Sequence, residues 1–440
     1  MLRRELAVAL GSPAAWLAAA VAGLIVGHSF VLALDLYTAA SRSVVEGALM
    51  AREFDPLLGV ARPTFGGADF CLTLLGPAVA ARVLAVEKER RTLHARLLAV
   101  ASPLRVLLAK TAAATVALAL LLVPVLFTML LWTCSGGQLG IAELMTLLAG
   151  GLLHALLLAS LATAAAAWTR GAAQATTLAL ALSLSAWILD AGSDFAALAW
   201  LGPLTQLSWT SRLAPFEQAL LLPSGVAWLL CAAAGAAAMA YLGLRSDWSA
   251  ARRGAMATLV VTATVLGLRA SDALRGGWDL SDAQRASFPA PLLAVLRALP
   301  GPIELDIFLD RDDSRRPPLE RDVLQRLRLA RSDVAIRFPI DAAADPATAV
   351  HDADYGKLEI RVAGAQVQTW STSRKEIVEL IFQAAGERLG AWEYSSYPGY
   401  PCVVEGAERR TLALLAYLVL PLGCVAAGLF TLRRSKRITK

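Results

Sequence analysis

Side chains that could do chemistry are few in this chain and do not cluster. Two of the four histidines, His28 and His154, lie within long apolar runs, and His351 neighbours Asp352 and Asp354 in a polar segment. A histidine inside an apolar helix more often hydrogen-bonds to a neighbouring helix than binds a metal. We therefore expect interhelical hydrogen bonds at His28 and His154, and a solvated acidic loop without a metal at His351.

Motifs for nucleotide binding and hydrolysis are absent from the sequence. No GxxxxGK[ST] loop occurs that could cradle phosphates, and the pair Gly356-Lys357 continues directly into a strand-like segment. HExxH, GxSxG and paired-cysteine zinc spacings do not occur either. The sequence therefore predicts a protein that is not an enzyme, holds no cofactor and leaves any ATP hydrolysis to a partner subunit.

The most informative stretch is Glu87–Lys110, EKERRTLHARLLAVASPLRVLLAK, which joins two apolar runs. Its first part is densely charged, and Leu93, Leu97 and Leu98 then follow at helical spacing, which gives a helix with one apolar stripe. A Ser-Pro pair ending at Pro103 breaks that helix. Periodicity alone favours a solvated loop with an interfacial helix, whereas the functional interpretation is a rigid lever that docks on a motor protein.

The composition places these residues in a membrane protein. Hydrophobic residues make up 57% of the 440, charged residues only 17%, and the mean hydropathy is +0.57, whereas soluble chains average about a quarter charged. Eight apolar runs lack the alternation of barrel strands, and a helix needs roughly 20 such residues to cross a bilayer. The runs are Ala14–Leu34, Ala68–Val86, Thr111–Trp132, Glu143–Trp168, Ala172–Leu189, Pro223–Leu244, Gly254–Leu268 and Thr411–Leu432.

Basic residues predict the orientation of these runs. They gather before the first run, between the second and third, between the sixth and seventh, and after the eighth, and eight spans put all these clusters on one face, the cytoplasm. The seventh run is short, roughly 15 residues, and spans if its flanking arginines snorkel. We therefore expect a multi-pass protein of the bacterial inner (cytoplasmic) membrane with cytoplasmic N- and C-termini. The net charge of +6 reflects this topology rather than nucleic-acid binding.

Four parts follow along the chain. Residues 1–245 hold six spans, 246–269 the seventh, 270–408 a polar domain outside the cytoplasm, and 409–440 the eighth span with a basic tail. Within the first part, Pro124 should kink the third span. The segment Asp190–Leu222, which holds Trp200 and Trp209, predicts a short broken helix at the external interface. The fold class is thus a polytopic α-helical membrane protein of about eight transmembrane helices with an extracytoplasmic α/β domain between the last two.

The prediction of an α/β fold for residues 270–408 rests on the spacing of apolar residues. Ile303, Leu305, Ile307 and Leu309 alternate with Glu304, Asp306 and Phe308, which is the pattern of a half-buried strand. The tripeptide Ala363-Gly364-Ala365 indicates a hairpin between two further strands. The expected strands are Ile303–Leu309, Val334–Ile340, Leu358–Val362 and Gln366–Trp370, and the expected helices are Pro291–Leu299, Leu319–Ala330 and Glu376–Leu389.

The stretch Glu87–Lys110 resembles the signature of ABC-2 type transporter permeases. Arg91 stands where that family usually has Gly, and His94 where it often has Glu. The matching residues are Glu87, Glu89, Thr92, Leu93, Leu97, Leu98, Ser102, Pro103 and Lys110. The resemblance implies a permease domain in residues 1–245 and an ATPase-coupling helix on the cytoplasmic side. Its site residues would be Glu87, Glu89, Arg90, Thr92, Leu93, Leu97, Leu98 and Pro103.

The second part of the chain resembles the GldG-like auxiliary component of ABC exporters. The matching run extends from Ser287 to Gly386 and includes LLAVLRALPGPIELDIFLD and the triplet Asp354-Tyr355-Gly356. Together the two resemblances imply a fused GldF/GldG-like exporter subunit. Its partners would be an ABC ATPase, a second permease chain (a homodimer or a close relative), the lipid bilayer and a periplasmic or envelope protein. Nucleic acid is not expected.

Charged residues inside the runs are nearly absent, with Asp69 and Asp190 at run ends, which argues weakly against ion-coupled transport. The apolar spans suit an amphipathic or lipid-linked substrate better than an ion. An alternative function is a membrane-anchored sensor or scaffold with an extracytoplasmic domain that binds a ligand or partner. The five cysteines form no disulfide framework, and a bridge between Cys134 and Cys402 stays open.

Overall fold

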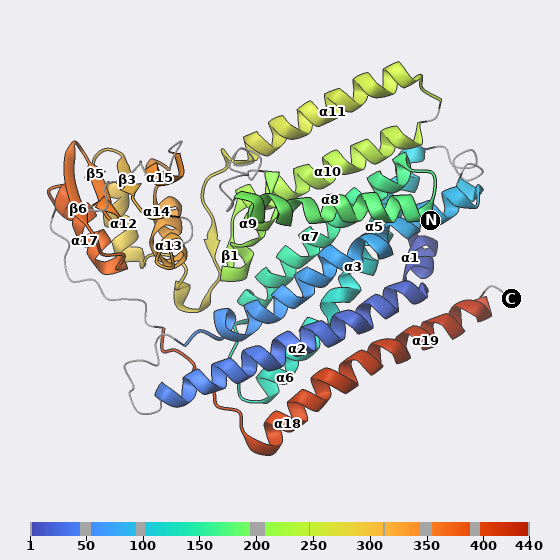
Figure 1. The fold of residues 1–440 in the computed structure, drawn as a ribbon, viewed down its shortest axis with the longest axis horizontal. Coiled ribbons are helices and arrows are strands. Elements are labelled where there is room, and N and C mark those ends of the chain that lie inside the picture. Colours follow the sequence, from blue (N-terminus) through green and yellow to red (C-terminus); the bar gives the residue numbers. More distant parts are fainter. Residues whose placement is uncertain are drawn as a thin grey trace. The chain divides into compact units, whose positions relative to one another are not determined.

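The computed structural model describes residues 2–44, 54–93, 102–193, 207–245, 247–310, 313–342, 354–387 and 397–438. Its residues fall into two compact units (Figure 1). Unit 1 contains residues 1–193, 200–274 and 398–440, and unit 2 contains Arg275–Tyr397.

Unit 1 is a helical bundle. Eight of its described helices are long and apolar enough to cross a membrane, which confirms the prediction of a multi-pass helical membrane protein. The spans are Pro13–Arg42 in α2 (Pro13–Val44), Leu57–Glu89 in η2 (Leu57–Ala61) and α3 (Arg62–Glu89), Pro103–Cys134 in α5 (Pro103–Ala119), η3 (Leu120–Leu122) and α6 (Val123–Cys134), Ile141–Trp168 in α7, Ala172–Leu189 in α8 (Ala172–Ser193), Pro223–Leu244 in α10, Ala250–Ser271 in α11, and Gly406–Arg433 in α18 (Gly406–Leu414), η9 (Leu415–Val419) and α19 (Leu420–Ile438).

The seventh span is longer than the apolar run predicted. Helix α11 has 22 residues, from Ala250 to Ser271, because the arginines at both ends of the apolar run are themselves good helix formers. The hydroxyl of Ser249 caps the helix by accepting the backbone N–H of Arg252 at 3.3 Å. A helix of this length crosses a bilayer without the thinning that a 15-residue run requires.

Proline disturbs the third span where the sequence predicts it. The α-helical hydrogen-bond pattern gives way to a 3-10 turn at Leu120–Leu122, immediately before Pro124. Proline has no N–H to donate, and its ring presses on the carbonyl four residues earlier, at Leu120. The sequence predicts a kink at Pro124, and the structure shows an interruption of the α-helical hydrogen bonds just before it.

The first and last spans lie side by side (Figure 1). Gly27 permits this approach, since a Cβ there would stand 2.6 Å from the carbonyl oxygen of Ala416. His28 Nδ1 lies 2.8 Å from the hydroxyl of Tyr417, which confirms the interhelical bond expected of His28. Arg409, in the first turn of α18, forms an ion pair at 2.6 Å with Asp35 of α2.

Two shorter features of unit 1 matter for function. The N-terminal helix α1 (Leu2–Leu10) packs against α5, and the sequence analysis does not anticipate it. The segment before α10 folds as α9 (Thr210–Leu213), η5 (Phe216–Gln218) and β1 (Leu220–Leu221). The broken helix predicted in this segment is therefore confirmed, although Trp200 lies outside the described residues.

Unit 2 is an α/β fold built on a four-stranded sheet of order β4-β3-β5-β6. Strand β3 (Ile303–Ile307) pairs in parallel with β4 (Val334–Arg337) and antiparallel with β5 (Leu358–Val362), which pairs antiparallel with β6 (Ala365–Thr369). One face of the sheet is fully buried, and it carries the alternating apolar residues that the sequence predicts. These are Ile303, Leu305, Ile307, Leu358, Ile360 and Val362.

The helices of unit 2 cover that apolar face and share one core with it. They are α12 (Ala290–Ala298), the continuous helix α13 (Arg316–Leu319), η7 (Glu320–Leu324) and α14 (Gln325–Ala330), and α17 (Arg374–Ala384). Strand β2 (Trp278–Asp279) and the turn η6 (Asp282–Gln284) precede them.

Two predicted C-terminal ends in unit 2 lie three or more residues too far along the chain. The strand expected to reach Ile340 ends at Arg337, and a short helix, α15 (Pro339–Ala342), follows because Pro339 has no N–H to extend the ladder. The helix expected over Glu376–Leu389 ends at Ala384, two residues before Gly386 adopts a φ of +76°. Glycine in this left-handed conformation is a common helix terminator.

The β5–β6 hairpin offers a test of this fold. Its two turn residues, Ala363 and Gly364, have φ values of +51° and +87°, which is the pattern of a type I′ turn. An alanine in this conformation is strained, and asparagine tolerates it better. We expect the fragment 275–397 to be soluble and to show helix and strand by circular dichroism. Ala363→Asn should raise its melting temperature, and Gly364→Val should lower it by about 4 °C or more.

A fragment without helix and strand signals would contradict the independent fold of unit 2. Equal melting temperatures for the parent fragment and Gly364→Val would contradict the turn type.

Candidate functional site

The predicted coupling segment, Glu87–Leu98, is not one helix in the structure. Glu87 and Glu89 belong to the last turn of α3, Arg90 follows as its C-cap, and the chain then turns at Arg91. Thr92 and Leu93 begin another helical turn, and residues 94–101 lie outside the described residues, Leu97 and Leu98 among them. Pro103 is the first residue of α5, a position where proline is favoured in a helix.

The turn at Arg91 has a conformation that glycine would adopt more easily. Arg91 has a φ of +58°, and a non-glycine residue pays roughly 1–2 kcal/mol for the left-handed region. The hydroxyl of Thr92 donates to the carbonyl oxygen of Glu87 at 3.2 Å and closes the turn. Arg91 is also the position at which the signature that this stretch resembles usually has glycine.

The exposure of the segment divides its residues into two groups. Glu89, Arg90, Arg91 and Thr92 are exposed, whereas Leu93 is 5% exposed and packs in the core of unit 1. A side chain in that position anchors the turn to the bundle. The exposed surface available to a partner is therefore the charged turn Glu89–Thr92, and not Leu93.

The end of α3 is tied to the turn between α7 and α8. The ammonium of Lys88 donates to the carbonyl oxygens of Ala166 and Ala167 at 3.2 and 2.5 Å, where the last turn of α7 leaves carbonyls without helical partners. The carboxylate of Glu89 accepts the N–H of Ala172, the first residue of α8, at 3.5 Å. Both contacts are favoured by the helix dipole. The ammonium of Lys88 faces the C-terminus of α7, which carries partial negative charge, and the carboxylate of Glu89 faces the N-terminus of α8, which carries partial positive charge.

A buried ion triad fixes the same region from the other side. Lys110 is 0% exposed, and its Nζ lies 3.0 Å from Glu5 Oε2 and 2.8 Å from Glu87 Oε2. It also donates to the carbonyl oxygen of Val83 at 3.1 Å. Glu87 thus ties the last turn of α3 to α1 and to the middle of α5 through Lys110. The expectation that Glu87 faces a partner protein is corrected accordingly, since its carboxylate serves the chain's own lysine.

The sequence analysis misses the triad because Glu5 and Lys110 are 105 positions apart. One signal was present, since Glu5 and Ala9 share a face of the N-terminal helix and both are buried. A carboxylate on the apolar face of a helix needs a counter-charge somewhere in the fold.

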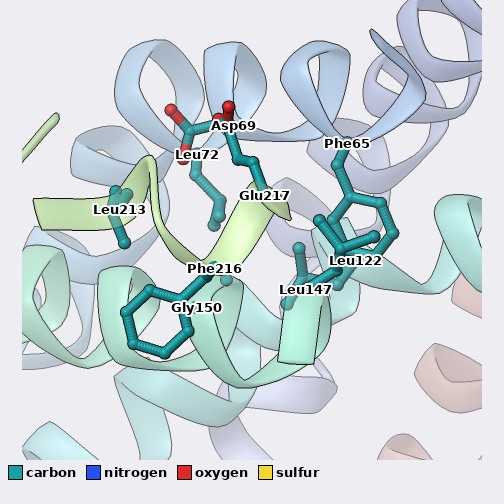
Figure 2. Close-up of a pocket in the computed structure, with 10 residues that line it drawn as sticks. Phe65, Asp69, Leu72, Leu122, Leu147, Gly150, Leu213, Phe216 and Glu217 are labelled. Atoms are coloured by element: carbon teal, nitrogen blue, oxygen red, sulfur yellow. The ribbon is translucent and has the colours of Figure 1, made fainter. Parts of the chain in front are cut away.

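A cavity lies towards the opposite end of α3, between α3, α7 and the segment α9–η5 (Figure 2). Its volume is about 380 Å³ with its open mouth included. The lining is mostly apolar and consists of Phe65, Asp69, Leu72, Leu122, Leu147, Gly150, Gly151, Leu213, Phe216 and Glu217.

Two polar pairs stand at this cavity. His154 Nδ1 lies 2.5 Å from Asp69 Oδ1, and Arg62 Nε donates to Glu217 Oε2 at 2.7 Å. The interhelical bond expected of His154 is therefore confirmed, with Asp69 of α3 as partner. Asp69 lies well inside the span Leu57–Glu89, so its placement at a span end is corrected. The second ring nitrogen of His154, Nε2, is buried without a partner among the described residues.

Between the cavity and the coupling segment, α3 contains a break in its hydrogen-bond ladder. Pro77 stands inside the helix and cannot donate to the carbonyl of Thr73, four residues earlier. The buried hydroxyl of Ser183, in α8, donates to that carbonyl instead. Helix α8 is therefore bonded to α3 both at this break and, through Glu89, at its end.

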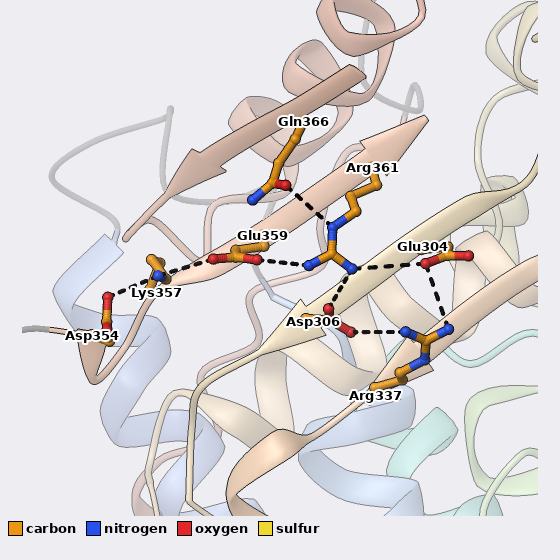
Figure 3. Close-up of polar contacts among 8 residues, drawn as sticks. All are labelled: Glu304, Asp306, Arg337, Asp354, Lys357, Glu359, Arg361 and Gln366. Atoms are coloured by element: carbon orange, nitrogen blue, oxygen red, sulfur yellow. Dashed lines mark hydrogen bonds and ion pairs between the residues drawn. The ribbon is translucent and has the colours of Figure 1, made fainter. Parts of the chain in front are cut away.

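The sheet of unit 2 carries a charged network on the face away from its core (Figure 3). Arg361 pairs with Asp306 at 2.8 Å and with Glu359 at 2.9 Å, and Arg337 lies 3.5 Å from Glu304. The sequence analysis expects Asp306 on a solvated face, but the residue is 8% exposed because Arg361 and its neighbours cover it. Most of these charges are paired within the face, where three carboxylates meet two guanidinium groups, so the face has little free charge to offer a ligand.

Tyr355 and Gly356, two of the residues that carry the resemblance in unit 2, lie against a second ion pair, whereas Asp354 pairs with Lys357 at 2.8 Å. Arg315 binds Asp313 through two nitrogens, at 2.7 and 3.0 Å, and the hydroxyl of Tyr355 donates to the same carboxylate at 2.9 Å. These hydrogen bonds, that of Arg315 first, hold the pKa of Asp313 well below its ordinary value. Gly356 leaves room for Arg315, whose Nη1 would stand 2.9 Å from a Cβ at that position.

The described residues form neither a metal-binding cluster nor a disulfide. In the described part of the chain, no group of three or more His, Cys, Asp or Glu side chains is placed to hold a metal ion. His351 and Asp352, for which a loop without a metal is expected, lie outside the described residues. All five cysteines are free thiols, so Cys134 and Cys402 are not bridged.

A scan against protein-family models found no match, and neither did searches of the curated proteins and of the solved structures.

The ion triad generates the first functional-site prediction. Lys110→Met leaves Glu5 and Glu87 without their cation and should destabilise unit 1 by about 3–5 kcal/mol. Adding Glu5→Gln removes the more deeply buried carboxylate and should recover part of this loss. The melting temperature in detergent, followed by reaction of the buried thiols of Cys71 and Cys424 with a fluorescent maleimide, measures both effects.

The single variant Glu5→Gln completes the double-mutant cycle. A melting temperature for Lys110→Met within about 1 °C of the wild type, or a double variant less stable than Lys110→Met, contradicts the triad.

Proposed function

We propose that this chain is the membrane-spanning permease subunit of an ABC transporter, an exporter driven by a separate ATPase, of the GldF/GldG-like fused type. The observation that carries the proposal is the exposed charged turn Glu89–Thr92 between the second and third spans. It coincides with the residues that resemble the ABC-2 signature. In the proposal this turn lies in the cytoplasm, and unit 2 lies outside.

Rigid attachment of the turn supports a coupling role. A contact surface transmits force only if it cannot move independently of the helices behind it. Here Lys88 is bonded to the end of α7, Glu89 to the start of α8, and Glu87 to α1 and α5 through Lys110. A partner that changes its contact with the turn therefore acts on five helices together. Such a contact shifts the permease only if its energy differs between the ATP-bound and free states of the partner.

The exposed apolar surface of α11 leaves room for a second permease chain as partner. Of the apolar spans, α11 is the least covered, with only 11% of its most apolar window buried. Its large apolar side chains Leu259, Val261 and Leu266 are more than half exposed. Lipid or a second copy would cover this surface. The proposal takes the assembly to be a dimer, since ABC exporters generally need two permease halves, with unit 2 receiving substrate or docking an envelope protein.

Capture of the ATPase tests the proposal directly. The tagged chain should bring down an ATPase subunit from its own host, and Glu89→Ala should weaken this capture and uncouple transport from ATP hydrolysis. Loss of a central contact residue costs roughly 2 kcal/mol of partner affinity, about 30-fold. Leu93→Asp should also uncouple, but it places a charge in the core and lowers stability, so Glu89→Ala is the sharper variant.

The matched control is Glu405→Ala, which removes an exposed carboxylate paired with Arg42 in the segment before α18. It should leave capture unchanged. If no ATPase is captured by the wild type, the membrane-anchored sensor or scaffold becomes the better proposal.

Cysteine labelling tests the proposed orientation. In a chain without its native cysteines, Thr92→Cys should react with a membrane-impermeant maleimide only when the cytoplasmic side is open. Gln138→Cys, in the exposed connection between α6 and α7, should react from outside, because one further span separates the two positions. Reaction of Thr92→Cys from the exterior of intact cells would reverse the topology and remove the coupling role.

A further inference from the structure

We propose that the cavity between α3, α7 and the segment α9–η5 binds an amphipathic organic cation, a positively charged nitrogen carried on an apolar body. The identification of this molecule as transported cargo rests on the proposed function. Binding itself needs no ATPase.

The walls of the cavity select for an apolar body. Eight of the ten lining residues are leucine, phenylalanine or glycine. The two glycines, Gly150 and Gly151 of α7, bring helix backbone to the wall, where a Cβ at Gly151 would stand 3.1 Å from Leu122. Each methylene that leaves water for such a surface contributes about 0.8 kcal/mol. A strongly hydrated ion would lose its water here without receiving enough oxygen ligands in return.

The ionisable groups of the lining are both acidic. Asp69 and Glu217 each have a side chain that is 33% exposed, and Figure 2 shows their carboxylates close to each other above the apolar part of the cavity. Their partners Arg62 and His154 are not among the lining residues. A molecule in the cavity therefore meets two carboxylates directly and the basic groups only behind them.

The electrostatics of Glu217 favours an added cation. Burial raises the pKa of this carboxyl, the ion pair with Arg62 opposes the rise, and the negative charge of Asp69 adds to it. Burial is the largest of these effects, so the ionised form has lost more hydration than its contact with Arg62 replaces. A positively charged nitrogen between Glu217 and Asp69 would stabilise both carboxylates, whereas an anion would meet repulsion from both.

The size of the cavity limits how much of the ligand it holds. The value of about 380 Å³ counts open solvent at the mouth, so the enclosed space is much smaller than that figure. The enclosed part therefore holds the ammonium group and at most the first carbons of its apolar body. The remainder of a long chain would extend through the mouth.

The experiment compares three probes with the same ten-carbon chain, namely decylammonium, decanol and decanoate. The purified full chain is placed in phosphatidylcholine nanodiscs, and binding is measured by isothermal titration calorimetry. Empty nanodiscs provide the subtraction for partitioning into lipid. The wild type should bind decylammonium about tenfold more tightly than decanol, which is one charge-assisted contact, and decanoate least.

The variant that removes the acidic pair is Asp69→Asn with Glu217→Gln. It should reduce the preference for decylammonium over decanol to less than about twofold. Glu405→Gln, which removes a carboxylate outside the cavity lining, should keep the wild-type preference. Leu147→Trp fills the cavity without changing its charge and should abolish saturable binding of both decylammonium and decanol, so the proposal stays testable if the double variant fails to fold.

Equal affinity of the wild type for decylammonium and decanol overturns the proposal, as does a preference for decanoate. Undiminished binding in Leu147→Trp overturns it as well. The ATPase capture described above reads out the proposed function separately. Cation binding without ATPase capture would retain the site and remove the transporter, and capture without cation binding would do the reverse.

Discussion

The ion triad of Glu5, Lys110 and Glu87 is the interaction on which the geometry of unit 1 depends. A lysine that is 0% exposed persists as a cation only if its charge is matched and its protons are accepted, because an unpaired buried charge costs several kcal/mol. Two carboxylates and the Val83 carbonyl oxygen do so here. Since these groups come from three helices, the triad fixes where α3 ends, and hence where the charged turn Glu89–Thr92 leaves the bundle.

The same constraint organises the other polar groups of the spans, and it distinguishes pairs that are closed on themselves from carboxylates that also face a cavity. His28 meets Tyr417, and the carbonyl freed by Pro77 meets Ser183. These pairs are local and leave no net charge. At the cavity, by contrast, the lining presents two carboxylates whose partners lie outside it. A protein in lipid retains such an arrangement at a cost, which is a physical reason to assign binding to the cavity rather than to the sheet face of unit 2, whose charges pair with one another.

Periodicity predicts what is local in this fold and misses what is long-range. All eight apolar runs, the break at Pro124 and the alternating strand at Ile303 follow from residues close in sequence. The burial of Asp306 does not, because it depends on Arg361 in another strand. The coupling helix is a sharper case. Its apolar spacing predicts one continuous helix from Glu87, and the left-handed residue Arg91 divides it. Local residue propensities predict poorly a left-handed backbone conformation that contacts elsewhere in the fold impose.

Helix α3 is the one element that both functional proposals share. Asp69 stands near its start and Glu87 at its end, with Pro77 between them. A helix bends at least cost where its hydrogen-bond ladder is already interrupted, so a force applied at the charged turn would be taken up at Pro77. The carbonyl released there is bound by Ser183 of α8, the same helix whose first N–H is accepted by Glu89. Movement of the turn would therefore displace α3 and α8 together, and the part of α3 beyond Pro77 carries Asp69 and Phe65, which line the cavity.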